Sequence, residues 1–165
     1  MKFCVLVVIV GAICLAGAQT SQDVKEKEVP AFLRQLADTR KAIADDYIHW
    51  VEAAKTKNVD AIVDMYTDDA TVLPEEKEAA TGKSAIRALY TDWFAQQDKL
   101  EGQRFENINS VQEGDLLIDS TRYSGTLLKD GKEVAFRGKR LVVWKRQFHG
   151  PWKILSDTWN RSPAE

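Results

Sequence analysis

LLIDSTRYSGTLLKDGKEVAFRGKRLVVWKRQFHGPWKILSDTWN, residues 116–160, has the pattern of three consecutive antiparallel strands joined by two tight turns. The first turn is Asp130-Gly131, a dipeptide that favours a two-residue hairpin because both positions accept a positive φ angle. The second turn is His149-Gly150-Pro151. The segment therefore predicts a three-stranded meander.

The two turns set the strand register, and with it the face of the sheet on which each side chain lies. We expect Lys129 to pair with Lys132 and Gln147 with Trp152, which sorts alternate side chains onto two faces. One face is large and aromatic and includes two carboxylates and a guanidinium: Leu117, Asp119, Thr121, Tyr123, Leu127, Val134, Phe136, Arg140, Val142, Trp144, Leu155, Asp157 and Trp159. This composition is typical of a cavity wall. A core that contains a buried salt bridge would have the same composition.

Upstream of the meander, the spacing of apolar residues predicts three helices. The first begins at Pro30 and ends near Thr56, with apolar residues at every third or fourth position. Asn58 can cap a second, shorter helix, which we expect to run through Tyr66. The third helix opens at Gly82.

The same part of the chain contains two predicted strands. One is short, over residues 70–73, and is followed by an acidic loop over 75–81; the other is long, over 103–112. Helices grouped before a run of strands imply one α+β domain, with the helices packed on one face of a curved sheet.

Four segments resemble the SnoaL-like branch of the nuclear transport factor 2-like superfamily, which has a cystatin-like fold. They are YTDDATVLP at 66–74, GKSAI at 82–86, FRGKRLVVWKR at 136–146 and WKILSDTWN at 152–160. The resemblance implies a cone-shaped, curved antiparallel sheet with three N-terminal helices on its concave face, a cavity between them, and commonly a dimer. It implies little about activity, because the superfamily includes isomerases, dehydratases, cyclases and non-catalytic binding or assembly domains.

The first residues have the three parts of a secretory signal peptide. Lys2 is followed by a short apolar run and by Ala16-Gly17-Ala18, so we predict a signal peptide over 1–18, a flexible arm over 19–29 and the SnoaL-like domain over 30–162. The apolar run is shorter than the roughly 20 residues that span a membrane. We therefore expect a secreted, extracellular protein without a membrane anchor.

Composition excludes several kinds of partner. Both cysteines, Cys4 and Cys14, lie in the predicted signal, so the mature chain would have no thiol chemistry and no disulfide. The formal net charge of −2 gives no basic surplus for nucleic acid. His49 and His149 lack ligand spacing, so we expect no metal and no cofactor. We expect the glycosylation acceptor at Asn160 to stay unoccupied, because it lies close to the strand end.

Two interpretations of the charged residues on the aromatic face stay open. In the first, Asp157 is an acid/base group in a cavity, helped by Tyr47 from the first helix. In the second, Arg140 lies between Asp119 and Asp157 in a structural ion-pair network.

The predicted cavity lining combines strand and helix residues. The sheet would contribute Asp119, Tyr123, Phe136, Arg140, Trp144 and Trp159, and the helices Trp50 and Trp93. Aromatic residues at helical spacing also commonly belong to a core.

The opposite face of the sheet carries an apolar strip of Ile118, Leu141, Val143 and Ile154. With helices on one side only, such a strip indicates that something covers it, and a second copy of the chain is the simplest cover.

These observations leave three functional hypotheses. The domain binds a small apolar or aromatic molecule in its cavity, or it is a lyase or isomerase that uses Asp157 with Tyr47, or it is a non-catalytic homodimerisation or assembly domain with a filled core.

Overall fold

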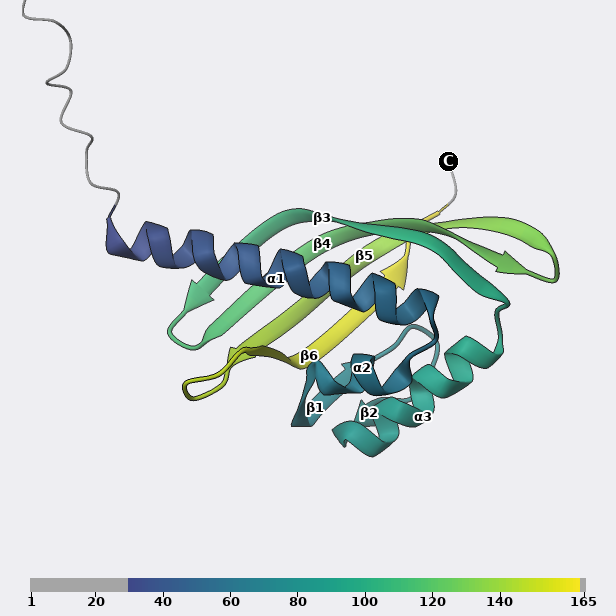
Figure 1. The fold of residues 1–165 in the computed structure, drawn as a ribbon, viewed down its shortest axis with the longest axis horizontal. Coiled ribbons are helices and arrows are strands. Elements are labelled where there is room, and N and C mark those ends of the chain that lie inside the picture. Colours follow the sequence, from purple (N-terminus) through teal and green to yellow (C-terminus); the bar gives the residue numbers. More distant parts are fainter. Residues whose placement is uncertain (1–29, 164–165) are drawn as a thin grey trace, which may run out of the picture.

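Within residues 30–163, which the computed structural model describes, six strands form one curved sheet and three helices lie on one of its faces (Figure 1). The predicted signal peptide over 1–18 and arm over 19–29 lie outside the described residues. In chain order the elements are α1 (Ala31–Lys55), α2 (Val59–Asp64), β1 (Tyr66–Leu73), β2 (Ala80–Thr81), α3 (Gly82–Ala95), β3 (Lys99–Glu113), β4 (Leu116–Lys129), β5 (Lys132–Arg146) and β6 (Trp152–Arg161). The predicted α+β class, with a curved sheet and N-terminal helices, is confirmed.

The sheet is mixed, which differs from the wholly antiparallel sheet that we expected. Its strand order is β2-β1-β6-β5-β4-β3, and β1 pairs with β6 in parallel while the other neighbours are antiparallel. The cause is topological: β1 precedes the meander in the chain but joins the sheet beside the last strand of that meander. The short strand β2 lies in the stretch predicted to be an acidic loop.

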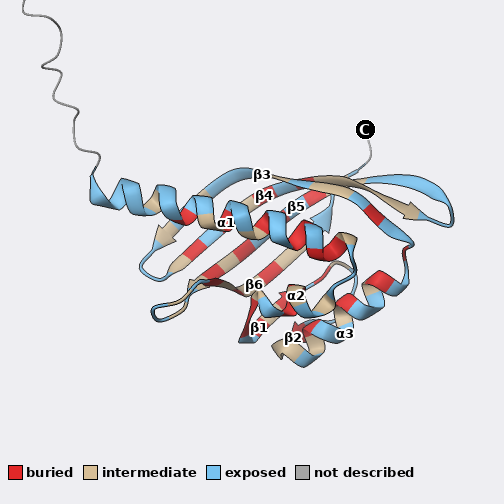
Figure 2. Cartoon of the chain, viewed as in Figure 1, coloured by how far each residue is buried: buried red, intermediate tan, exposed pale blue. Residues whose placement is uncertain are grey.

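Helix α1 follows the sequence prediction closely. Ile43, Tyr47, Trp50 and Ala54 lie along one stripe and are buried, while its first turns extend beyond the sheet and are largely exposed (Figures 1 and 2). Burying such a stripe stabilises a helix more than its intrinsic propensity does. The helix ends at Lys55, next to the predicted end.

Helix α2 is shorter than predicted. The Asn58 side chain caps it by accepting a hydrogen bond of 3.0 Å from the Ala61 backbone N–H, as expected for a helix start. The helix ends at Asp64, and Tyr66 begins β1, so the prediction that Tyr66 lies in the helix is wrong. This shift turns the Tyr66 side chain toward the middle of the domain, where it is fully buried.

The register of the first hairpin is confirmed. Lys129 pairs with Lys132 and Asp119 with Val142, in agreement with an Asp-Gly turn whose two residues have φ angles of 51° and 70°. On the next strand, Val142 pairs with Asp157, also as predicted. The large aromatic face of the meander therefore points toward the helices.

A β-bulge at Leu155 interrupts the pairing of β5 with β6. Val143 pairs with Ser156, but Trp144 pairs with Ile154, so Leu155 has no partner. The expected pairing of Gln147 with Trp152 is wrong, because the bulge moves Trp152 opposite Arg146. The extra residue also reverses the alternation, since an odd shift exchanges the two faces of a strand.

The bulge corrects one prediction about the far face. Ile154 was expected there with Ile118, Leu141 and Val143, but it is fully buried among the helices. Ile118 and Leu141 are more than 40% exposed and Val143 is half-buried. Within the described residues the three helices lie on the opposite face and leave this strip uncovered.

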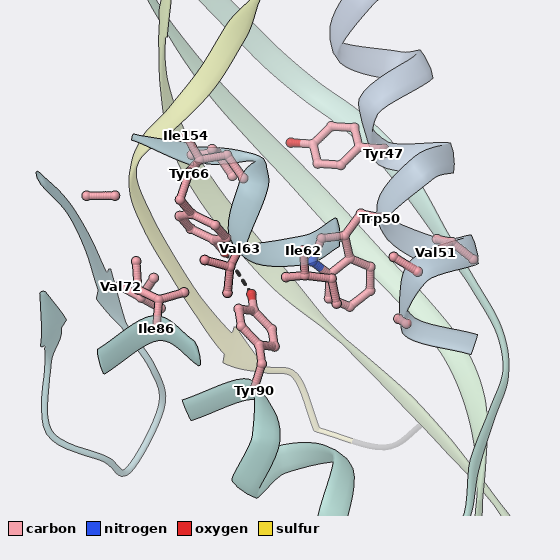
Figure 3. Close-up of a cluster of buried hydrophobic side chains, with 14 of the residues drawn as sticks. Tyr47, Trp50, Val51, Ile62, Val63, Tyr66, Val72, Ile86, Tyr90 and Ile154 are labelled. Carbon is pink, nitrogen blue, oxygen red and sulfur yellow. Dashed lines mark hydrogen bonds between the residues drawn. The ribbon is translucent and has the colours of Figure 1, made fainter. Parts of the chain in front are cut away.

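The part of the core under α2 and α3 is solid. Ile62, Val63, Val72, Ile86 and Ile154 come from four different elements, and each is at most 1% exposed (Figure 3). Two hollows bordered by α1 residues lie elsewhere in the domain. No helix among residues 30–163 has the length and hydropathy needed to cross a membrane.

Candidate functional site

A buried ion pair joins the last two strands. Arg140 on β5 lies diagonally opposite Asp157 on β6, and its Nε and Nη2 donate to the two carboxylate oxygens at 2.8 and 2.5 Å. The side chains are 5% and 0% exposed. Such a bidentate pair combines charge with fixed geometry. Loss of hydration would lower the pKa of Arg140, but the charge and hydrogen bonds of Asp157 outweigh this and raise it.

Two phenols continue this cluster into the core. The Tyr66 hydroxyl donates to Oδ2 of Asp157 at 2.8 Å and lies 2.7 Å from the Tyr90 hydroxyl (Figure 3). Because the Tyr66 proton is used toward Asp157, the Tyr90 hydroxyl is the donor in the second bond. Burial, and to a smaller extent the charge of Asp157, raises the pKa of Tyr90 to about 12. The same two causes raise the pKa of Tyr66. Both phenols are therefore neutral donors at physiological pH.

A second polar cluster surrounds Asp119 on β4. The Tyr47 hydroxyl on α1 donates to Oδ2 at 2.6 Å, and Asn107 and Ser110 on β3 donate to Oδ1 at 2.6 and 2.8 Å. The pKa of Tyr47 is raised, mainly because the phenol is buried. The charge of Arg140 lowers this pKa, and the charge and hydrogen bond of Asp119 raise it further. The expected arrangement of Arg140 between two carboxylates is thus replaced by two separate clusters.

Aromatic rings lie over the Arg140 guanidinium. Its Cζ is 5.6 Å from the centre of the Tyr47 ring, 5.8 Å from that of Trp50 and 5.5 Å from that of Phe105. Contacts of this kind stabilise a cation, more strongly where water is excluded.

A small hollow, here called the aromatic hollow, lies next to these rings and has a volume of about 100 Å³. Its lining consists of Trp50, Tyr90, Trp93, Gln103, Phe105, Tyr123, Leu127, Phe136, Arg140, Trp159 and Arg161. Six of the eight predicted lining residues are among them. Gly138 makes room for Tyr123, because a Cβ at that position would lie 2.3 Å from the Tyr123 hydroxyl.

A larger hollow, here called the α1 groove, lies between α1 and strands β3 and β4 and has a volume of about 590 Å³. Its lining consists of Arg40, Ile43, Ala44, Tyr47, Ile48, Val51, Glu52, Lys55, Gln103, Arg104, Phe105, Asn107, Ser110, Leu117, Asp119 and Thr121. Gln103 and Phe105 belong to both hollows and therefore separate them.

The remaining predicted site residues fall in different places. Asp119 and Tyr47 line the α1 groove, whereas Asp157 lines neither hollow. Trp144 is fully buried and packs edge-on against Tyr47 with ring centres 5.7 Å apart, so it belongs to the core and not to a cavity wall. The sequence brings Arg140 and Asp157 together correctly but gives no sign of Asn107 and Ser110.

Both histidines lie away from these clusters. His49 is exposed on α1, and His149 is exposed at the tip of the turn between β5 and β6. Within residues 30–163, no group of three or more His, Cys, Asp or Glu side chains is close enough to hold a metal ion.

A curved sheet over N-terminal helices, with an interior hollow between them, is the architecture of nuclear transport factor 2-like proteins. Similar solved structures include a ketosteroid isomerase-like protein from Erwinia carotovora atroseptica, with a TM-score of 0.66 and 21% identity over 78% of this chain and 98% of that one. A nuclear transport factor 2-like protein with a cystatin-like fold from Novosphingobium aromaticivorans has a TM-score of 0.61 and 16% identity, over 78% and 85% of the two chains. At these identities the likeness shows the fold alone.

The SnoaL-like domain matches residues 47–146, from Tyr47 on α1 to the last residue of β5. Because this match covers 100 of the 165 residues, the chain belongs to the SnoaL-like family, as the sequence motifs predicted. A search of curated proteins gives no match.

Proposed function

We propose that the aromatic hollow binds a small planar molecule that presents an oxygen acceptor to Arg140. The observation that carries this proposal is the lining: most of its side chains are aromatic, and two guanidinium groups lie among them, the buried one of Arg140 and the exposed one of Arg161. Ligand pockets commonly combine apolar walls with a few polar groups that fix orientation.

The hydrogen bonds of Arg140 support an acceptor as the ligand group. The Nε and Nη2 atoms of Arg140 donate to Asp157, and Nη1 of Arg140 has no hydrogen-bond partner among the described residues. A carbonyl, phenolate or carboxylate oxygen could accept from it. The volume of about 100 Å³ is smaller than the roughly 150 Å³ of a cavity known to hold benzene, so the ligand can be no larger than about one ring.

The position of Asp157 favours binding over the lyase or isomerase alternative. An acid/base residue has to reach the proton that it transfers, and Asp157 is fully buried behind Arg140 and Tyr66.

Binding of acetophenone, benzoate and benzylamine, followed by tryptophan fluorescence, tests the proposal. We expect acetophenone or benzoate to bind and benzylamine, which offers a donor, to bind about tenfold more weakly or not at all. Leu127→Trp should fill the hollow and abolish binding, while the exposed Leu73→Trp serves as a control for an added indole. Equal binding of all three probes, or binding that survives Leu127→Trp, would contradict the proposal.

We also propose that the domain forms a homodimer through the far face. Ile118 and Leu141 expose apolar surface there, and the half-buried Val143 pairs with Ile118 on the same face. A two-fold axis places each patch against its own copy, so Val143→Glu would bring like charges together. Sedimentation should then show a monomer with unchanged circular dichroism. A wild-type protein that is monomeric at micromolar concentration would refute this interface.

The proposed site of action is extracellular, on the basis of the three-part pattern over residues 1–18. Expression of the full chain in a secreting host should give a protein in the medium that begins at Gln19. Retention of the full-length chain in the cells would contradict this.

A further inference from the structure

The environment of Asp119 is incomplete in a way that points to a second ligand. Tyr47, Asn107 and Ser110 are neutral donors, and within residues 30–163 no cationic side chain forms a salt bridge with Asp119. The residue is only 3% exposed. Burying a carboxylate without an opposite charge is costly unless hydrogen bonds compensate for the lost water.

The carboxylate can accept one more hydrogen bond. It has about four lone-pair directions, and Oδ2 accepts from Tyr47 alone while Oδ1 accepts from both Asn107 and Ser110. Asp119 also lines the α1 groove, so the fourth bond can come from a molecule in that groove.

Thr121 supplies an independent observation. It lies two residues after Asp119 on the same face of β4, lines the same groove and is 1% exposed. Among the described residues its hydroxyl has no hydrogen-bond partner. Buried hydroxyls without partners are uncommon, and each calls for an explanation such as an unseen partner.

The walls and volume of the groove define the rest of the ligand. Ile43, Val51 and Leu117 give apolar surface, and Phe105 stacks on Tyr47 with ring centres 4.4 Å apart. The volume of about 590 Å³ lies within the range of small-molecule sites. Lys55 at the rim is paired with Glu52 at 3.0 Å.

We propose that the α1 groove is a second binding site, for an apolar molecule that carries a hydroxyl or amine donor, and that Asp119 anchors this donor. The chemistry is opposite to that proposed for the aromatic hollow, where the protein supplies the donor. The two sites are therefore expected to select different ligands.

A matched series of probes tests this assignment on the full chain. The probes are 1-naphthylmethanol, 1-naphthylmethylamine and 1-naphthoate, which share one ring system and differ in the polar group. We expect the alcohol or the amine to bind about tenfold or more tightly than the carboxylate, because the carboxylate meets Asp119 with a like charge. The tighter of the two donors identifies the chemistry of the natural ligand.

Variants locate the binding. Ala44→Trp places an indole in the groove from the exposed side of α1 and should weaken binding about tenfold or more. His49→Trp adds the same indole to α1 outside the groove lining and should leave binding within about twofold. Asp119→Asn should remove the preference for donors over the carboxylate, with folding verified by circular dichroism.

Three results would overturn the assignment. They are equal or tighter binding of 1-naphthoate, binding that is insensitive to Ala44→Trp, and the lack of binding by all three probes at about 1 mM. Because acetophenone and benzoate test the aromatic hollow separately, failure of one site is distinguishable from failure of the other.

Discussion

Asp119 and Asp157 point toward the same interior, 38 positions apart in the chain and two strands apart in the sheet, yet their surroundings differ in kind. Asp157 has a full opposite charge from Arg140 and a phenol donor from Tyr66, and it lines neither hollow. Asp119 has neutral donors only among the described residues, and it lines the larger hollow.

This difference separates what holds the fold from what remains open to a ligand. Both oxygens of Asp157 accept hydrogen bonds within its cluster, from Arg140 and Tyr66, and removing either member of the ion pair leaves the other charge uncompensated. A carboxylate held by neutral donors keeps an unused acceptor and its charge. Replacing Asp157 should therefore act mainly through stability, and replacing Asp119 mainly through binding.

Breaking the first cluster should have the greatest consequence. Asp157→Asn leaves the Arg140 guanidinium buried without a counter-charge, which should lower the free energy of unfolding by about 3–5 kcal/mol. Urea denaturation measures this, with the exposed Asp69→Asn as a control that should change it by less than about 0.5 kcal/mol. An unchanged stability accompanied by altered ligand binding would instead favour the acid/base interpretation.

High pH should act on the same cluster through Tyr90. Its pKa is 10.0 when unfolded and about 12 in the folded protein. Because the pKa is higher in the folded state, the contribution of Tyr90 to the free energy of unfolding is complete below pH 10. It is lost as the pH rises to about 12, since the unfolded state releases its proton first. The loss is on the order of 2–3 kcal/mol, at 1.36 kcal/mol for each unit of pKa.

Denaturation at a series of pH values, for wild type and Tyr90→Phe, isolates this effect. The wild-type free energy of unfolding should decline more steeply above pH 10 than that of the variant. If the free energies of unfolding of wild type and variant depend on pH in the same way, the pKa of Tyr90 is not raised in the folded protein. The pKa of Tyr123 is also raised to about 12, mainly by burial, and its contribution cancels in the difference.

The smallest effect on stability is expected at the second cluster. Asp119→Asn retains one acceptor oxygen for its three donors, so we expect a loss of about 1–2 kcal/mol, well below that of Asp157→Asn. Denaturation of both variants under identical conditions gives the comparison. A loss at Asp119 equal to or greater than that at Asp157 would show that the two carboxylates have the same structural role.

The sequence predicts the first cluster far better than the second. The Asp-Gly turn fixes the register of β4 with β5, and the adjacent strands then place Arg140 beside Asp157 by simple alternation. Two of the three donors to Asp119, Asn107 and Ser110, come from β3, where a shift in pairing between Asn107 and Asn109 interrupts the alternation. Such bulges depend on tertiary packing, so local sequence gives no sign of them.

The same limit explains the other errors. Tyr66 fits the apolar period of α2, but it lies in β1 because the strand pairs with Ile154 at that point. The aromatic lining was predictable because large apolar residues recur with period two along the strands. Whether each ring borders empty space or the core, as for Trp144, depends on how α1 packs across the sheet.

The bulge at Leu155 also marks a position at which β6 could lose one residue without changing the rest of its pairing. β6 has one residue more than β5 needs, and loss of Leu155 would place Trp144–Ile154 and Val143–Ser156 in uninterrupted succession. Every other side chain of the strand would keep its face, including Asp157. Relatives that differ by one residue here can thus share the same interior, and a gap-free alignment through this strand would assign Ile154 or Asp157 to the wrong side of the sheet.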